Sequence, residues 1–325
     1  MKKFKKSLIL TLLMISMPFT ILAYSDYIIP GGENIGIEIK TDGILVVGTY
    51  EIDGKYPANE AGIKIGDTII KANNQNISSI DELISVLSSA TDSIDIVIKR
   101  DDKEIKTNLK LKQEDGIKKT GIYVKDNITG IGTLSYIDPN TRIYGALGHE
   151  VLESNTSKML EVKDGKIVSS SVNRIERSES GLPGSKNASL ENITKGNISK
   201  NTTSGIFGDY TASLPNKEKY KVANPTEIKT GEAKILTVLK DKEVKEYTIN
   251  IIKLDKLNKN NKNILFEVTD QELLKETGGI VQGMSGSPII QKDYIIGAVT
   301  HVVVDDPTKG YGIFITNMLE EGERD

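Results

Sequence analysis

The chain has 325 residues, of which 38% are hydrophobic and 27% charged, and its formal net charge is −3. This length typically holds two domains, the composition is that of a globular protein, and the small negative charge offers no basic surface to a nucleic-acid partner. The absence of cysteine excludes disulfides, thiolate metal sites and a cysteine nucleophile. Because only two histidines are present, His149 and His301, we also expect no metal centre and no cofactor.

The N-terminus has the pattern of a targeting segment. Four lysines within the first six residues precede an apolar run from Leu8 to Ala23, and the secretion machinery keeps such a basic flank in the cytoplasm. We therefore expect residues 1–24 to form a targeting helix, as a signal peptide or a signal anchor, and the rest of the chain to be extracytoplasmic. The run contains Pro18 and is short for a stable membrane span, so cleavage and retention both stay open.

Residues 33–112 have the pattern of a PDZ domain. The segment PANEAGIKIGDTIIKAN, residues 57–73, resembles the PDZ signature. In it a short helix ends at a glycine, and a Gly-Asp turn leads into the next strand. An amphipathic helix with four apolar side chains on one face and a closing hairpin are predicted to follow. These elements are residues 79–89 for the helix, and 94–100 and 105–111 for the two strands.

A PDZ domain binds an extended peptide, often a C-terminus, as an added strand beside its helix. We expect residues 31–36 to form the loop that holds the peptide carboxylate, and the next strand to line the groove. The predicted peptide-binding residues are Ile35, Gly36, Ile37 and Leu83. A second interpretation is that the domain only packs on the catalytic domain as a structural lid.

Residues 113–325 are predicted to form a second, mostly β domain. Short alternating runs bounded by Gly, Asn, Asp and Pro indicate an antiparallel β sandwich or barrel. Residues 185–204 are polar and rich in Asn, Ser and Thr, and we expect a mobile loop there. The predicted strands are residues 233–239, 244–252, 264–268, 289–290, 295–304 and 311–315.

The run GIVQGMSGSPII, residues 279–290, contains the motif on which the functional prediction depends. Its core, G-M-S-G-S-P, resembles the motif of trypsin-like serine peptidases, G-D-S-G followed by Gly or Ser and then Pro. A tight turn would expose the hydroxyl of Ser285, and Gly283 and Gly286 allow the backbone angles of such a turn. We expect the N–H groups of Gly283 and Ser285 to form an oxyanion hole. Ser287 is the rival nucleophile, less well spaced from the glycines.

A serine nucleophile needs a general base, and the chain offers two histidines. His149 follows the small residues of the run YGALGH, which would let an imidazole swing from a turn into a cleft. His301 lies within an apolar strand and is the less suitable candidate. The order of His149 before Ser285 is also that of trypsin-like peptidases.

Four segments, together with the preceding PDZ-like module, resemble the SpoIVB peptidase family; they are residues 200–208, 279–288, 297–302 and 306–312. The resemblance covers nearly the whole chain and implies a trypsin-like double β-barrel with a His-Asp-Ser triad. It also implies a role in sporulation. Such a peptidase is secreted into the space between the two forespore membranes, where it cleaves a membrane-bound regulator and so activates the metalloprotease that processes pro-sigma-K. Cleavage of its own chain near the N-terminus is implied as well.

The family places the triad acid shortly before the nucleophile. The matching residue is Asp270, 15 residues before Ser285, where it follows a predicted strand. A cap of the helix that begins in the run TDQE is the alternative role of Asp270. Asp209 is the second candidate for the acid.

Two classes of function follow from these predictions. The first is an active serine endopeptidase whose partners are a protein or peptide substrate, a peptide terminus in the PDZ groove, and the membrane-bound regulator of a metalloprotease. The second is a non-catalytic PDZ adaptor with a decayed peptidase fold. The intact Ser285, His149, Gly283 and Gly286 favour the first. HtrA-type proteases place the peptidase before the PDZ domain, so the module order here argues against that family.

Overall fold

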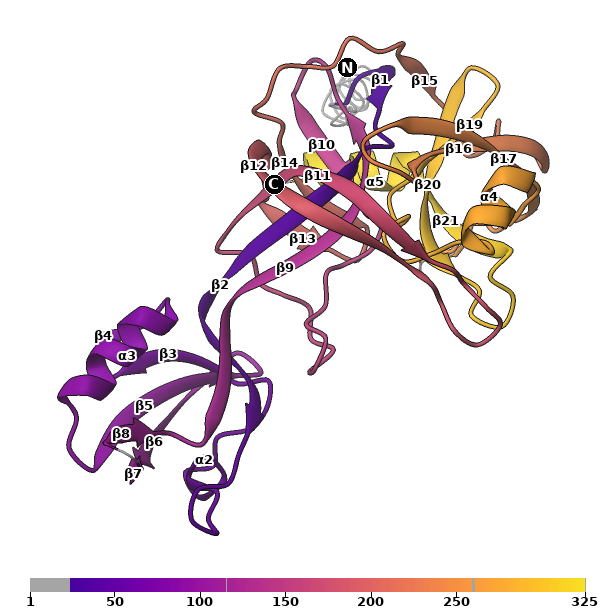
Figure 1. Ribbon diagram of the computed structural model, residues 1–325. Helices are drawn as coiled ribbons and strands as arrows, with labels where there is room; N and C mark the ends of the chain where they lie inside the picture. The colour runs from indigo at the N-terminus through magenta and orange to yellow at the C-terminus, as the bar shows by residue number, and fades with distance from the viewer. Residues whose placement is uncertain (1–23, 115, 259–260, 325) are drawn as a thin grey trace, which may run out of the picture.

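The computed structural model describes residues 24–114, 116–258 and 261–324. Strands make up most of this part of the chain and the helices are few and short (Figure 1), which confirms the mostly β fold class. Except for Tyr24, the predicted targeting helix at residues 1–24 lies outside the described residues. Where the chain is described, no helix is both long and apolar enough to cross a membrane.

The smaller of two units has the arrangement of a PDZ domain. Its main helix begins at Ser79 with a capping box: the Ser79 side chain accepts from the N–H of Glu82, and the Glu82 side chain accepts from the N–H of Ser79. The predicted helix and closing hairpin are both present. The elements are α2 (Pro57–Glu60), β3 (Thr68–Ala72), β4 (Gln75–Asn76), α3 (Ile80–Ser89), β5 (Ser93–Arg100) and β6 (Lys103–Lys110), followed by the small hairpin of β7 (Lys112–Glu114) and β8 (Ile117–Lys119).

The larger unit is a β-barrel protease-like fold, as predicted. Its strands are almost all antiparallel and close on themselves, around three clusters of buried apolar side chains. The elements found only in this unit are β1 (Tyr27–Pro30), β10 (Ile143–Ala146), β11 (Asp164–Glu176), β12 (Ser185–Asn197), β13 (Lys200–Thr202), β14 (Gly205–Asp209), β15 (Tyr220–Val222), β16 (Gly231–Val238), β17 (Val244–Leu254), β18 (Ile264–Val268), α4 (Gln271–Thr277), β19 (Pro288–Gln291), β20 (Tyr294–Val302), β21 (Lys309–Phe314) and α5 (Ile315–Glu323).

Two long strands, β2 (Asn34–Thr49) and β9 (Ile122–Ile137), run through both units and connect them (Figure 1). They pair in antiparallel register in the larger unit until Lys40 opposes Asn127, and after a register irregularity they pair again in the smaller unit. The PDZ unit is therefore inserted into a hairpin of the larger unit, which begins before it in the sequence.

The position predicted for the peptide groove is wrong, because the strand expected to line it is an interior strand of the larger unit. Ile35 and Ile37 pair with β9 on one side and β11 on the other, and each is only 2% exposed. Gly36 lies between them in the same interior strand of the larger unit. Leu83 of α3 belongs to the apolar core of the PDZ unit. An interior strand offers no free edge to a peptide, so Ile35, Gly36 and Ile37 do not form the predicted groove.

Residues 185–204 form strands instead of the predicted mobile loop. β12 pairs with β11 along its length, with three register irregularities, and β13 follows it. Most side chains of β12 are at least partly exposed, so the strand tolerates a polar sequence, and the pairing with β11 supplies its order.

Candidate active site

Ser285 lies on a tight turn between α4 and β19. Gly283 and Gly286 flank it in left-handed backbone conformations, with φ of +93° and +95°. A Cβ atom on Gly286 would lie 2.0 Å from the carbonyl oxygen of Thr133 and 2.6 Å from the nitrogen of Leu147. The turn therefore packs directly on β9 and on the segment that follows β10, and only glycine fits at this contact.

Thr133 of β9 holds the same turn through two hydrogen bonds. Its N–H donates to the carbonyl of Ser285 (2.9 Å) and its hydroxyl to the carbonyl of Gly283 (2.7 Å). The N–H groups of Gly283 and Ser285 donate to no other group of the described chain. Two unbonded N–H groups beside a candidate nucleophile are what an oxyanion hole requires.

The hydroxyl of Ser285 donates a hydrogen bond to the carbonyl of Thr300 on β20, at 2.8 Å. In this conformation it makes no hydrogen bond to an imidazole of the described chain. The rival serine, Ser287, is fully buried, and its hydroxyl has no partner among the described residues. Because a fully buried hydroxyl cannot reach a substrate, the structure favours Ser285 over Ser287.

His149 follows β10 after two residues with left-handed backbone, Leu147 (φ +71°) and Gly148 (φ +73°). Its Nδ1 lies 2.7 Å from the carbonyl oxygen of Glu150. A carbonyl can only accept, so in the neutral ring the proton sits on Nδ1 and the lone pair of Nε2 is free to take a proton. Burial lowers the pKa of His149 below its ordinary value, and the hydrogen bond to Glu150 offsets part of this effect.

The second histidine lies beside the first. The ring centroids of His149 and His301 are 5.3 Å apart. Desolvation, followed by the charges of His149 and Lys262, lowers the pKa of His301. Both predicted base candidates are thus part of one site, and the hydrogen bond that fixes the tautomer distinguishes His149.

These groups line a cavity of about 530 Å³. Among the described residues that line it, the only ionisable side chains are those of His149, His301 and Glu150, and most of the rest of its wall is apolar. The apolar lining residues are Ile37, Ile131, Leu147, Val151, Leu152, Pro183, Ile280, Val281, Val302 and Val304.

Asp270 lies at the N-cap of α4 and does not line this cavity. One of its carboxylate oxygens accepts from the N–H of Leu273 (3.0 Å) and the other from the N–H of Thr248 (3.2 Å). The structure therefore shows the helix cap that was the alternative for Asp270, with no hydrogen bond to His149. Asp209 lies exposed on β14, also outside the cavity wall. The predicted His-Asp-Ser triad is not assembled in this conformation.

Three residues that shape the site were not predicted. Thr133 and Thr300 hydrogen-bond the nucleophile turn, and Lys186 is buried against Gly283. The two threonines lie inside apolar runs, where a single polar residue is a weak signal of a special role. Lys186 lies in a polar run that gives no local signal at all.

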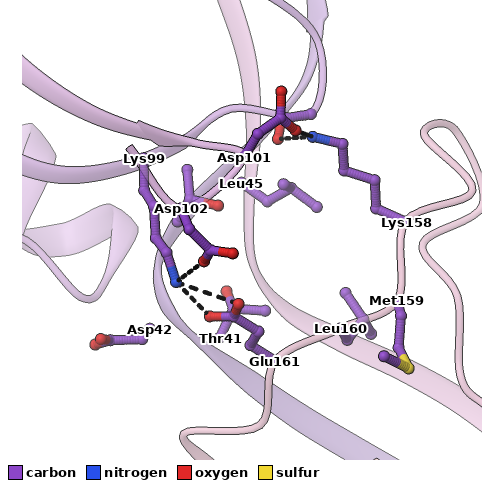
Figure 2. A pocket seen from close by; sticks show the side chains of 12 residues that line it. Thr41, Asp42, Leu45, Lys99, Asp101, Asp102, Lys158, Met159, Leu160 and Glu161 are labelled. Atoms are coloured by element: carbon purple, nitrogen blue, oxygen red, sulfur yellow. Dashed lines mark hydrogen bonds and ion pairs between the residues drawn. The ribbon is translucent and has the colours of Figure 1, made fainter. Parts of the chain in front are cut away.

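A second cavity, of about 280 Å³, lies between the PDZ unit and residues 158–161 (Figure 2). Lys99 lies 3.2 Å from Asp102 and 2.9 Å from Glu161, and Lys158 lies 3.8 Å from Asp101. Such solvent-accessible ion pairs contribute little stability. Two of these pairs, Lys99 with Glu161 and Lys158 with Asp101, join the two units, so we interpret this cavity as a contact between the units.

Two family models match the chain. The SpoIVB peptidase S55 model matches residues 116–319, and the PDZ domain model matches residues 34–111. A search of the curated proteins gives no match.

Similar solved structures include the PDZ domain of the SdrC-like protein from Listeria monocytogenes, which is 25% identical with a TM-score of 0.24 and covers 27% of this chain and 93% of that chain. The Rv3671c protease in an inactive form is 12% identical with a TM-score of 0.35, over 60% of this chain and 85% of that chain. An inactive mutant of Rv3671c from M. tuberculosis is also 12% identical, with a TM-score of 0.31, and covers 59% of this chain and 80% of that chain. With TM-scores this low, these likenesses carry no argument about function.

Proposed function

The chain belongs to the SpoIVB peptidase S55 family, and on this basis we propose that it is a serine endopeptidase with Ser285 as nucleophile and His149 as general base. One observation carries the proposal. A partly exposed Ser285, two unbonded N–H groups and an imidazole with a free Nε2 meet at one cavity.

The proposed reaction begins with a rotation of the Ser285 side chain, because its hydroxyl is bonded to Thr300. The freed hydroxyl gives its proton to Nε2 of His149 while its oxygen attacks the carbonyl carbon of a peptide bond. The carbonyl oxygen becomes negative and accepts from the N–H groups of Gly283 and Ser285. His149 then gives the proton to the leaving amine, and a water molecule repeats the sequence to release the acyl group.

The third role, that of orienting the imidazole, is proposed for the carbonyl of Glu150. It lies 2.7 Å from Nδ1 of His149 and so favours the tautomer that the reaction needs. The triad implied by the family resemblance would require Asp270 to leave the cap of α4. We therefore propose Asp270 as the orienting acid only for a conformation in which the cap is broken.

The proposed substrate is an extended peptide with an apolar residue next to the scissile bond. Ile280 and Val281 lie at the start of the nucleophile turn, and Val302 follows Thr300 on β20; all three line the cavity. An apolar wall gives a charged side chain no partner, so a Lys, Arg, Asp or Glu side chain would be desolvated there at a cost. An aliphatic side chain would instead gain from its burial.

For the PDZ unit, we propose that a peptide terminus binds between α3 and residues 122–126 of β9. These residues pair with β2 along one edge, and no other described strand pairs with their second edge. The N–H of Ile80 at the start of α3 donates to Asp126 (2.7 Å) and fixes the helix beside that edge. A free strand edge next to a helix is where a PDZ domain adds its ligand as a strand.

Control of the catalytic site by the PDZ unit is part of this proposal. Leu152 lines the catalytic cavity, and Lys158 and Glu161 of the same segment contact the PDZ unit. A movement of the PDZ unit would therefore be transmitted to a wall of the cavity.

The proposed setting is extracytoplasmic, during sporulation. Residues 1–24 have the pattern of a signal peptide or anchor, and the name of the family supports a sporulation role. We propose a membrane-bound regulator of the pro-sigma-K processing metalloprotease as substrate, and a site near the N-terminus of the chain itself as a second one.

The alternative, a non-catalytic PDZ adaptor, is favoured by two observations: the Ser285 hydroxyl is hydrogen-bonded to Thr300, and the triad is not assembled. To separate the two, the purified protein is incubated with a peptide library and the cleaved bonds are identified by mass spectrometry. We expect cleavage after Leu, Ile, Val or Met. Ser285→Ala should reduce cleavage by several orders of magnitude and Ser287→Ala far less. If the wild-type protein shows no cleavage that Ser285→Ala removes, the adaptor is established. Cleavage after charged residues would contradict only the proposed specificity.

A further inference from the structure

Lys186 is buried beneath the nucleophile turn without a charged partner. The residue is 2% exposed. Its Nζ donates one hydrogen bond, to the hydroxyl of Thr237 on β16 (2.9 Å). Lysine is almost never fully buried unless it is paired, so its position here calls for a physical reason.

The backbone around Lys186 holds the turn that carries the candidate oxyanion hole. The N–H of Lys186 donates to the carbonyl of Gln282 (2.9 Å), and the N–H of Gln282 donates to the carbonyl of Gly184 (2.8 Å). Together they make a parallel bridge between β12 and the turn. The start of β12 therefore fixes the peptide units on either side of Gln282, directly before Gly283.

The side chain of Lys186 also packs against the same turn. A Cβ atom built on Gly283 would lie 3.1 to 3.3 Å from Cδ, Cγ and Cβ of Lys186. The methylene stem thus packs against Gly283, whose N–H is free. If the stem moved, the turn would lose its contact on this side.

We propose that Lys186 is a positioning residue of the peptidase: it holds the Gln282–Gly283 segment in the geometry of the oxyanion hole while its amine is neutral, and it releases the segment when the amine is protonated. This inference rests on the proposed function only in assigning the turn to catalysis. An ammonium group with a single hydroxyl acceptor is poorly compensated in the interior and is drawn towards water.

The pH range of this switch follows from the burial. Desolvation lowers the pKa of Lys186 from 10.5 to about 7. The turn, residues 279–287, has no titratable side chain. The neighbouring strands β11, β16 and β17 carry further titratable side chains, and none of them contributes to the shift; they are Asp164, Lys166, Arg174, Glu176, Glu232, Lys234, Lys245, Glu246, Tyr247 and Lys253.

Protonation of the buried Lys186 amine destabilises the folded protein at low pH, because its pKa differs between the folded and unfolded states. An unfolded lysine keeps its proton up to about pH 10.4, whereas folded Lys186 loses it near pH 7. Between these values the unfolded state binds more protons, so the free energy of unfolding rises with pH. Below pH 7 both states are protonated and the full cost of the buried ammonium is present.

The test compares wild type with Lys186→Met, which keeps the length of the stem and lacks the amine. Each kcat is divided by its own value at pH 8. At pH 6 we expect wild type to retain about one tenth or less, because a group with a pKa near 7 alone gives a tenfold loss and the protonation of His149 adds to it. In Lys186→Met only His149 remains, so the loss at pH 6 should be at most about fourfold. Lys234→Met, an exposed lysine on β16 paired with Glu246, is the matched control and should keep the wild-type ratio.

A second readout does not depend on catalysis. Hydrogen exchange of a peptide covering residues 279–287 is measured in Ser285→Ala with and without Lys186→Met. We expect faster exchange at pH 6 with Lys186 than with Met, and equal exchange at pH 8; Lys186→Gln serves if the Met variant does not fold. Equal exchange at both pH values, or an unchanged pH ratio of kcat, would overturn the proposal. A protein that cleaves nothing but shows the exchange difference would refute the proposed function and leave the switch in place.

Discussion

The carboxylate of Asp270 accepts two backbone hydrogen bonds at the start of α4, and the contribution of this cap can be measured. We expect Asp270→Ala to lower the free energy of unfolding by about 1 kcal/mol. Asp270→Asn should lower it much less, because asparagine caps helices about as well as aspartate. Denaturant unfolding of the three proteins gives the comparison.

Turnover of the same variants tests the catalytic role of Asp270. A cap role leaves kcat of Asp270→Asn close to wild type. A loss of roughly 10⁴ in a stably folded Asp270→Asn protein, the size expected when the orienting acid is removed, would show that the carboxylate reaches His149 in the active conformation.

At the scale of residues, the sequence was informative where chemistry restricts the choice. Ser285 stands out because glycines flank it at fixed spacing, and His149 because the chain has only two imidazoles. The role of Asp270 could not be read, since an N-cap and a triad acid both place Asp after a strand. Lys186 could not be found either, because its burial depends on a pairing between β12 and a turn far along the chain.

At the scale of elements, the nucleophile turn depends on the close contact of Gly286 with β9. The left-handed backbone of Gly286 would cost an alanine about 1–2 kcal/mol, and its Cβ would overlap the carbonyl oxygen of Thr133 at 2.0 Å. We therefore expect Gly286→Ala to destabilise the protein by more than about 3 kcal/mol and to abolish cleavage. Thermal unfolding and the peptide assay measure the two effects.

Gly181 provides the matched control. It also has a left-handed backbone, with φ +80°, but a Cβ there meets nothing within 4 Å. Gly181→Ala should lower the free energy of unfolding by about 1–2 kcal/mol, the cost of a left-handed backbone for alanine, and the variant should keep its activity. Equal melting temperatures for the two variants would mean that the contact with Thr133 is not as tight as the structure has it.

Helices and strands were predicted well where their own residues determine the structure. The capping box and apolar face of α3 are both contained in residues 79–89, and that helix was found. β12 was missed because its order comes from its pairing with β11, which its own Asn, Ser and Thr residues do not reveal. The first half of β2 was assigned to the PDZ domain because it directly precedes that domain, although its partners lie in the peptidase unit.

At the scale of the whole molecule, the insertion of the PDZ unit predicts that it can be removed. Lys40 and Asn127 are direct partners on β2 and β9, a spacing that a two-residue hairpin turn can close. We expect a chain in which Asn-Gly replaces residues 41–126 to fold and to cleave short apolar peptides, while it no longer binds peptide termini. Circular dichroism, thermal unfolding and the peptide assay test this.

A separate deletion sharpens the interpretation. Removal of residues 24–112, which follows the module order expected from the sequence, also removes β1 and the first half of β2 from the larger unit. That chain should fail to fold. If it folds and cleaves peptides while the hairpin-closed chain does not, the two units are arranged in series after all.

The pairing of Lys40 with Asn127 also has a consequence for the history of the gene. A domain joined at one end of a protein is gained or lost by a single breakpoint, and a truncation removes it cleanly. Here the coding segment of the PDZ domain lies inside that of the peptidase, so its gain or loss takes two breakpoints that meet at adjacent points of one hairpin. Any other domain whose two ends lie as close together could occupy the same position, and relatives with a different insert, or a bare turn, are to be sought at this hairpin.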